Sequence, residues 1–286
     1  MNNPLVSVII PTYNGSRFIK ETIQSALDQT YRNLEIIVID DGSTDNTPEI
    51  VKSTNNQKVT YIRQENAGAA MARNLGINIS KGEYIAFLDH DDLWLPHKLE
   101  RQLLLFGKNP MVAMVYSDTF IIDENNFVTG KFSQKTKFFR GMIFKELFLS
   151  CFITILTVII KRSVFIEIGP FLPFKISEEY DLYLKCAAKY SIDYINEPLA
   201  KYRIHESNTS KNYETEASDC IKIYNFWKNH EGITEYNIDE LISKATAKTY
   251  YNAFKNAIRR RGDYKGAIKY FLLFLYSWAK RIAKKG

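Results

Sequence analysis

The chain has 286 residues, which corresponds to about two domains of ordinary size. Hydrophobic residues make up 45% of it, and 38 Lys and Arg against 32 Asp and Glu give a net charge of +6. This composition excludes collagen-like, low-complexity and disordered chains. The three cysteines, Cys151, Cys186 and Cys220, are far apart and have no zinc-ligand spacing, which excludes a disulfide framework and favours a reducing compartment.

The sequence contains no candidate membrane span. No stretch reaches the roughly 18 uncharged apolar residues that a spanning helix needs. The first residues lack the basic segment of a secretory signal, and the apolar run 6–10 stops at Pro11. We therefore expect a cytoplasmic protein.

Positive charge is concentrated at the end of the chain. Residues 255–286 contain ten Lys or Arg and one acid, which gives +9 and leaves the first 254 residues at −3. A protein that binds nucleic acid would carry basic residues throughout its fold, so we expect no nucleic-acid partner.

Short apolar runs alternate with helical patterns over the first part of the chain, which is typical of βαβ units with a mostly parallel sheet. Strands are expected at 6–10, 34–39, 59–62 and 84–88. Helices are expected at 16–30, from 47 onward, at 67–80 and at 96–106, with Ser16 and Thr47 as N-caps and Pro48 at the first helical position.

The remainder of the chain is less regular. Further strands are expected at 112–116, 152–160, 192–195 and 199–204, and a helix at 178–190. The longest uncharged run, 147–160, predicts a buried strand. Residues 118–140 have no clear period, and the pattern beyond Asn208 is helical.

Polar residues follow three of the predicted strands: Tyr13 and Asn14 the first, Asp40 and Asp41 the second, and Asp89, His90 and Asp91 the fourth. In an open α/β sheet, ligands bind outside the carboxyl ends of the strands. We therefore expect these side chains to converge on one rim.

The residue types at this rim suit a nucleotide and a metal. A tyrosine ring such as Tyr13 can stack on a nucleobase, and a carboxylate such as Asp41 can accept a hydrogen bond from a base or ribose. Two acids spaced like Asp89 and Asp91 can hold Mg²⁺ or Mn²⁺ between two phosphates. The alternative is that Asp91 and Asp92 cap the helix that begins near Pro96.

Two common phosphate-binding loops are absent from the sequence. It contains neither GxxxxGK[ST] nor GxGxxG, which argues against a P-loop NTPase and a dehydrogenase. The charge of a bound phosphate would then be met by a metal and by side chains such as Arg73.

The first ninety-two residues contain four motifs. They are Val-Ser-Val-Ile-Ile-Pro-Thr-Tyr-Asn at 6–14, Asp-Asp-Gly-Ser-Thr-Asp at 40–45, Asn-Ala-Gly at 66–68 with Ala-Arg-Asn at 72–74, and Phe-Leu-Asp-His-Asp-Asp at 87–92. In this order they resemble the motifs of the family 2 glycosyltransferases with the GT-A fold. A weaker likeness continues through 177–182 and 202–205.

The resemblance implies an α/β fold with a mixed, mainly parallel, Rossmann-like sheet flanked by helices. The catalytic domain would span 1–205, with a nucleotide-sugar half at 1–106 and an acceptor half at 107–205. A C-terminal helical region, 206–286, would follow.

The resemblance also implies an activity. The chain would transfer a sugar, with inversion, from a UDP-sugar to a hydroxyl of a glycan or polyprenyl-linked acceptor in bacterial surface polysaccharide synthesis, with Mn²⁺ or Mg²⁺ as cofactor. The residues that would bind the nucleotide sugar are Pro11, Tyr13, Asp41, Arg73 and Asp89. The metal would be held by Asp91, His205 and Asp89, although His205 also fits a polar residue past an extended segment.

The general base of an inverting transfer takes the proton of the acceptor hydroxyl. In the family this base is usually the Asp of a Glu-Asp pair at the start of a helix. Here the pair is Glu178-Glu179, so Glu179 occupies that position with one extra methylene, and Glu178 or Asp181 are alternatives. Acids in a first helical turn also stabilise the helix dipole. Trp94, after the acidic motif, would either form an acceptor-side wall for a sugar ring or belong to the core.

The tail 264–285 predicts a basic amphipathic helix. Its apolar stripe consists of Ala267, Phe271, Phe274, Leu275, Trp278 and Ile282. Such a helix fits an anionic membrane surface, and it also fits a terminal helix packed on protein.

Two other functions remain open from the sequence. A sugar-1-phosphate nucleotidyltransferase usually has a glycine-rich, basic loop after the first strand, whereas residues 14–17 offer one Gly and one Arg. A non-catalytic glycan- or membrane-binding module would fit the unusual Glu179. The sequence leaves the oligomeric state unknown.

Overall fold

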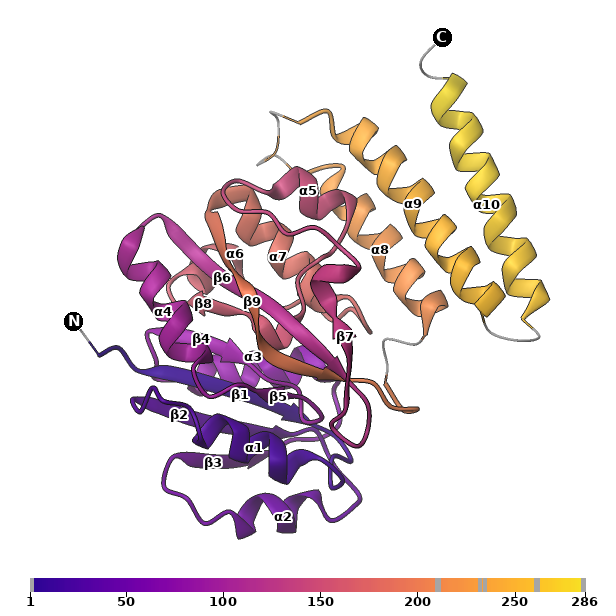
Figure 1. Ribbon diagram of the computed structural model, residues 1–286. Coiled ribbons are helices and arrows are strands. Elements are labelled where there is room, and N and C mark those ends of the chain that lie inside the picture. The colour runs from indigo at the N-terminus through magenta and orange to yellow at the C-terminus, as the bar shows by residue number, and fades with distance from the viewer. Residues whose placement is uncertain (1–2, 209–211, 231–232, 234–235, 260–262, 284–286) are drawn as a thin grey trace. The chain divides into compact units, whose positions relative to one another are not determined.

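The computed structural model describes residues 3–208, 212–230, 233, 236–259 and 263–283 (Figure 1). The chain forms two compact units. The first comprises Met1–Ile143, Phe152–Pro173 and Lys185–Glu206, and the second comprises Phe144–Cys151, Phe174–Leu184 and Ser207–Gly286.

One mixed sheet organises the first unit. Its strands are β1 (Val6–Thr12), β2 (Leu34–Asp40), β3 (Val59–Arg63), β4 (Tyr84–Phe87), β5 (Leu93–Trp94), β6 (Val112–Ile122), β7 (Val128–Lys131), β8 (Ile159–Lys161) and β9 (Ser191–Arg203). The order is β3-β2-β1-β4-β8-β6-β9-β5, with β7 paired to β6. The strands β1 to β4 are parallel, β8 is antiparallel to β4 and β6, and β9 is parallel to β6. The expected α/β fold with a mixed sheet is confirmed.

Helices flank this sheet and make up most of the second unit (Figure 1). Those of the first unit are α1 (Ile19–Leu27), α2 (Thr47–Ser53), α3 (Ala69–Ile79), α4 (Lys98–Lys108) and α6 (Val164–Ile168), with the short 3₁₀ turns η1 (Phe132–Gln134) and η2 (Ile155–Thr157). Those of the second are α5 (Phe144–Leu149), α8 (Tyr213–Trp227), α9 (Ile238–Arg259) and α10 (Tyr264–Ala283), and α7 (Glu178–Lys189) begins there.

The strands β1 and β2 are buried on both faces. Val8 and Ile10 pack in one cluster with Ile23 of α1, whereas Ile39 packs in another with Ala72 of α3. Strands covered by helices on both sides need apolar residues at every position rather than at alternate ones. This explains why both read as continuous apolar runs.

Helix α3 lies unusually close to β1. A Cβ atom added at Gly76 would be 2.6 Å from Cγ2 of Ile9, a distance that real side chains do not tolerate. The absence of a side chain at Gly76 therefore allows the close approach that fixes α3 against the sheet. Arg73 lies one helical turn before Gly76 and is held by the same packing.

The first strand continues through the proline that we expected to close it. Pro11 pairs with Ile39 of β2, and β1 ends at Thr12. The backbone oxygen of Ile9 accepts a hydrogen bond from the amide of Leu88, so the polar backbone groups of Ile9 point toward β4. The backbone nitrogen of Pro11, two residues later, points the same way, but the pairing with β4 has already ended at Ile9 and Phe87. Its missing N–H therefore costs no ladder hydrogen bond.

The strand expected at 152–160, within the uncharged run 147–160, is wrong for most of its length. Residues 144–149 form α5, η2 follows at 155–157, and only 159–161 form the short strand β8. The amide of Thr157 donates to the oxygen of Thr154, a local turn that competes with strand pairing. An uncharged run without a period does not separate these alternatives.

The expected N-caps Ser16 and Thr47 are also wrong. Both residues instead donate hydrogen bonds to the carboxylate of Asp45. Helix α1 begins only at Ile19, and the amide of Ser16 donates to Oδ2 of Asp45. Helix α2 begins at Thr47, whose amide and hydroxyl donate to Oδ1 of Asp45.

Two helical glycines provide a matched test of the α3 packing. Gly76→Ala should destabilise the protein by about 1–3 kcal/mol because the new methyl group overpacks against Ile9. Gly107→Ala in α4, where the added Cβ meets nothing within 4 Å, should leave stability unchanged or raise it by about 0.5–1 kcal/mol. Urea unfolding of both variants is the measurement, and equal effects would contradict the close approach.

Candidate active site

Strand register brings the polar ends of β1, β2 and β4 to one rim. Thr12 lies opposite Asp40 in the β1–β2 pair, and Ile9 lies opposite Phe87 in the β1–β4 pair. The loops after β1 and β4 touch: a Cβ atom added at Gly15 would be 2.5 Å from Oγ1 of Thr12 and 2.7 Å from Cδ2 of His90. The residues after the three strands therefore surround a common edge of the sheet.

Hydrogen bonds join the loop after β1 to the loop after β2. The amide of Asn14 donates to Oγ of Ser43, and the amide of Thr44 donates to Oδ1 of Asn14. Asn14 has a φ of 50°, a left-handed conformation that asparagine adopts more readily than most residues. This turn leaves the neighbouring Tyr13 side chain 47% exposed at the rim.

Asp41 holds the loop that leads into α3. Its carboxylate accepts hydrogen bonds from Nε2 of Gln64 and from the amides of Ala67 and Gly68, all at 2.7–2.8 Å. Gly68, with a φ of 90°, immediately precedes α3. Asp41 is buried, so its contacts in this structure are with the protein itself.

Arg73 of α3 forms an ion pair with Asp89. Nη2 of Arg73 lies 2.7 Å from Oδ1 of Asp89, and the arginine side chain is 5% exposed. The guanidinium also lies 5.7 Å from the ring centroid of Phe171. This pair fixes the start of the acidic segment after β4 and puts a positive charge beneath it.

Asp91 is paired with His205, which follows β9. Oδ2 of Asp91 lies 2.8 Å from Nε2 of His205. Burial raises the pKa of Asp91, but the hydrogen bond from His205 and the charges of His90 and His205 outweigh it, and the pKa stays below its usual value. Asp91 is therefore ionised at neutral pH.

Asp92 has a different environment. Oδ1 accepts a hydrogen bond from the amide of Arg203, and Oδ2 meets no hydrogen-bond partner within the described part of the chain. Burial, with the charges of Asp91 and Asp89, raises the pKa of Asp92 well above its usual value. Neither Asp91 nor Asp92 caps the following helix, since α4 begins at Lys98 with no side-chain cap.

Arg203 is a residue of the site that the sequence reasoning missed. Its side chain is fully buried, and Nε donates a hydrogen bond to the backbone oxygen of Asp91. Nη2 forms an ion pair with Glu21 of α1 at 3.0 Å, and Nη1 donates to Oδ1 of Asn126. The guanidinium also covers the ring of Phe18, 4.4 Å from the centroid. Arg203 thus joins β9, α1 and the β6–β7 turn to the acidic segment, and its place two residues before His205 was the available signal.

The two candidate bases differ in exposure. Both lie in the second unit, in the first turn of α7, where Glu178 is 4% exposed and Glu179 is partly exposed. Asp181, in the same turn, is fully buried. Of the three acids, Glu179 has the side chain most accessible to a substrate.

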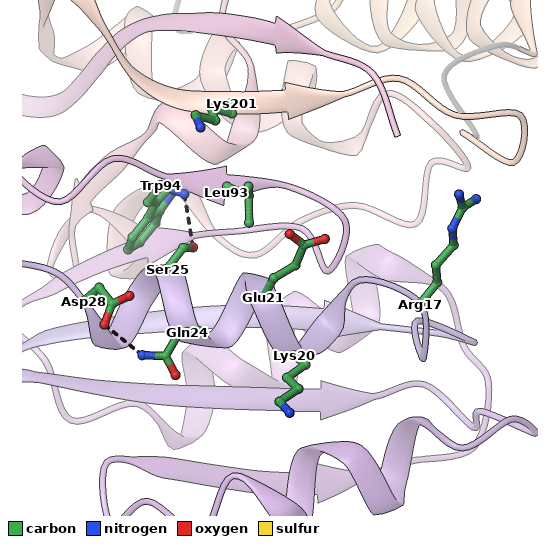
Figure 2. A pocket seen from close by; sticks show the side chains of 9 residues that line it. All are labelled: Arg17, Lys20, Glu21, Gln24, Ser25, Asp28, Leu93, Trp94 and Lys201. Carbon is green, nitrogen blue, oxygen red and sulfur yellow. Dashed lines mark hydrogen bonds between the residues drawn. The ribbon is translucent and has the colours of Figure 1, made fainter. Parts of the chain in front are cut away.

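Trp94 packs into the core of the first unit. Its side chain is 4% exposed, and its indole N–H donates to the oxygen of Leu156. One edge borders an open cavity of about 550 Å³ between α1, β5 and β9 (Figure 2). The residues that line this cavity include Lys20, Glu21 and Lys201, and none of the rim residues Tyr13, Asp41, Asp89 and Asp91.

Asp91 and His205 are the rim side chains that could bind a divalent cation. No cluster of three or more His, Cys, Asp or Glu side chains placed to hold a metal occurs among the described residues. Asp91 and His205 nevertheless supply an ionised carboxylate and an imidazole side by side. Carboxylate and imidazole are accepted by Mn²⁺, and phosphate oxygens of a substrate can complete the shell.

Comparison with known proteins agrees with this geometry. Residues 7–169 match the family model described as "Glycosyl transferase family 2". The Escherichia coli UDP-Glc:alpha-D-GlcNAc-diphosphoundecaprenol beta-1,3-glucosyltransferase WfgD is 38% identical over 216 residues, which cover 74% of this chain and 82% of that protein. An uncharacterized glycosyltransferase of Rickettsia typhi is 37% identical over 212 residues, 73% of this chain but only 66% of the relative's length.

A solved structure has the same fold. The Staphylococcus aureus TarS fragment 1-349, crystallised with UDP-GlcNAc, superposes with a TM-score of 0.72 at 18% identity, over 95% of this chain and 81% of that one. The likeness to TarS shows the GT-A fold, and the family match with the curated relatives shows that the chain is a glycosyltransferase. The chain belongs to glycosyl transferase family 2.

Arg203→Met should destabilise the protein by about 1–3 kcal/mol, because the hydrogen bonds that the fully buried guanidinium donates to Asp91, Asn126 and Glu21 are lost. Arg17→Met is the matched control: its ion pair with Glu124 is exposed, so its loss should cost less than about 1 kcal/mol. Chemical unfolding of both variants is the measurement. Equal losses would contradict the role of Arg203 in joining these elements.

Proposed function

We propose that the chain transfers the sugar of a UDP-sugar, with inversion, to a hydroxyl of a polyprenyl-linked or other glycan acceptor in bacterial surface polysaccharide synthesis. The observation that carries the proposal is the rim, where an exposed tyrosine, an arginine-paired aspartate and an ionised aspartate beside a histidine follow neighbouring strands. The similarity to WfgD, a UDP-Glc-dependent glucosyltransferase that acts on a diphosphoundecaprenol-linked sugar, supports a UDP-sugar donor and a lipid-linked acceptor. Family membership favours this function over a nucleotidyltransferase or a binding module.

The nucleotide would bind along β1, β2 and β4. The exposed ring of Tyr13 would stack on the uracil, beside Pro11 at the end of β1 and the loop that Asp41 holds. Asp89, fixed by Arg73, would accept hydrogen bonds from the ribose. Arg73 also offsets negative charge near the diphosphate.

The diphosphate would be held with a divalent cation, Mn²⁺ or Mg²⁺. Asp91 and His205 are the residues that would hold the ion, and Asp89 lies two positions from Asp91. When bound, the cation neutralises charge on the leaving diphosphate. Arg203 keeps the backbone of Asp91 in place through its Nε hydrogen bond.

Glu179 is the proposed base. Its carboxylate takes the proton of the acceptor hydroxyl as that oxygen attacks the anomeric carbon from the face opposite UDP. The bond between the sugar and the diphosphate breaks, and UDP leaves with the electron pair. The partial exposure of Glu179 favours it over the buried Glu178 and Asp181.

The acceptor class favours a protein that works at the inner face of the plasma membrane. A polyprenyl carrier is confined to the bilayer, so an enzyme that reaches its head group from the cytoplasm needs at least transient membrane contact. We therefore place the chain in the cytoplasm, peripherally associated with the membrane.

Trp94 is buried except for the edge that borders the cavity of Figure 2, so only this edge would contact an acceptor.

Asp91→Asn should weaken Mn²⁺-dependent UDP binding by at least tenfold, because even outer partners of a metal site are worth about 10- to 100-fold in affinity. Asp28→Asn is the matched control and should bind UDP normally, because this acid lies in the C-terminal cap of α1, where its side chain accepts a hydrogen bond from Gln24. Titration calorimetry with and without Mn²⁺ is the measurement. Absence of UDP binding by the parent chain would refute the proposed function.

Glu179→Gln should lower the turnover of a UDP-sugar by about 10²- to 10⁴-fold, since the amide cannot take a proton, while UDP affinity stays unchanged. Glu178→Gln should retain more activity if its buried carboxylate does not reach the acceptor. A screen of UDP-sugars by ligand-observed NMR would first identify the donor. Normal turnover in Glu179→Gln would reject the base assignment and leave the family function intact.

A further inference from the structure

Helix α10 is held by one well-defined face. Gly266 and Tyr270 are buried, and the amide of Gly266 donates to Oδ1 of Asp263, which caps the helix. A Cβ atom at Gly266 would be 2.5 Å from the hydroxyl of Tyr213 in α8, and that hydroxyl donates to Asp263. These contacts fix which side of α10 packs against the other helices of the second unit.

The opposite side of α10 is apolar and exposed. Ile268, Leu272 and Leu275 follow one line along the helix, away from Tyr270, and are 62%, 59% and 39% exposed. Further exposed aromatic side chains border this line: Tyr264, Phe271, Tyr276 and Trp278. We call these seven residues the outer face of α10.

The outer face differs from the apolar stripe that the sequence predicted for this helix. Ala267 and Phe274 of that stripe are partly buried, whereas Phe271, Leu275 and Trp278 are exposed; the side chain of Ile282 lies outside the described residues. Helix α10 therefore carries apolar side chains both on the side that packs against other helices and on the exposed outer face. An apolar surface of this extent on a soluble protein is typical of a binding surface.

Charge decides between the possible occupants. Lys265 is exposed beside the outer face, and residues 255–286 carry a net charge of +9. A second copy of the chain would bring the same charge against itself, which opposes a symmetric contact through this region. An anionic lipid surface complements the charge and accepts the apolar side chains.

We infer that the outer face of α10 lies in the interface of an anionic bilayer, with Ile268, Leu272 and Leu275 inserted and Lys265 at the head groups. Within the described residues, no helix has the length and hydropathy that crossing a bilayer requires. An apolar line on one side of a helix, with a lysine beside it, fits a helix that lies along the surface. The inference deepens the proposed function, on which it rests: it names the surface through which the enzyme meets the membrane of a polyprenyl-linked acceptor.

Vesicle binding of the full chain tests this inference. The protein should sediment with phosphatidylcholine vesicles that contain phosphatidylglycerol, much less with phosphatidylcholine alone, and less as salt is raised. Tryptophan emission should shift to the blue on binding. Since Trp94 and Trp227 are buried and Trp278 is 49% exposed, the shift should disappear in Trp278→Phe.

Single substitutions locate the surface. Leu272→Asp should weaken binding to the anionic vesicles by at least about tenfold, and Lys265→Glu should do so by about tenfold, because it reverses a charge near the lipid surface. Ile166→Asp is the matched control: Ile166 is 87% exposed but lies in α6 of the first unit, so binding should be unchanged.

Calorimetry with UDP and the oligomeric state of the chain make the outcome decisive. Calorimetric UDP binding should be normal in Leu272→Asp, which shows that the substitution leaves the first unit folded. A parent chain that binds UDP but no anionic vesicles, equal binding by Leu272→Asp and the parent, or an oligomer that Leu272→Asp converts to monomer would each overturn the lipid assignment. A chain that binds vesicles but no UDP would instead contradict the proposed function.

Discussion

The parallel register of β1 with β2 and β4 is the constraint on which the site depends. It places Thr12 level with Asp40 and Ile9 level with Phe87, so three loops leave the sheet at one edge. The loops are then tied to each other through Asn14 and Asp45, with no room for a side chain at Gly15. Rigid strands thus position residues that are distant in sequence.

The first half of the fold was predictable because its physics is local. Runs such as 34–39 are apolar at every position, which indicates strands covered on both faces, and the polar residues after them indicate the rim. The second half was less predictable. Residues 147–160 carry no period, and the strand β9 spans two expected strands because a bulge in its pairing with β6 near Asp118 interrupts the pattern without ending the strand.

The sequence predicted which polar residues the sheet brings to one rim, but few of the contacts that they make there. The pairing of Asp91 with His205, 114 positions apart, followed from the family resemblance and not from any spacing. Apart from its place two residues before His205, nothing in the sequence marked Arg203, because an arginine in a strand has no signature for burial. Only the folded chain brings Glu21, Asn126 and Asp91 around it. Likewise, periodicity identified α10 as apolar but could not show which of its sides packs against protein.

The raised pKa of Asp92 has a consequence for an anionic ligand. Asp89, Asp91 and Asp92 would together form a repulsive surface for a diphosphate if all three were bare anions. Arg73 balances the first, His205 adjoins the second, and burial favours the neutral form of the third. A motif that reads as strongly acidic is therefore less repulsive toward a phosphate than three bare carboxylates would be.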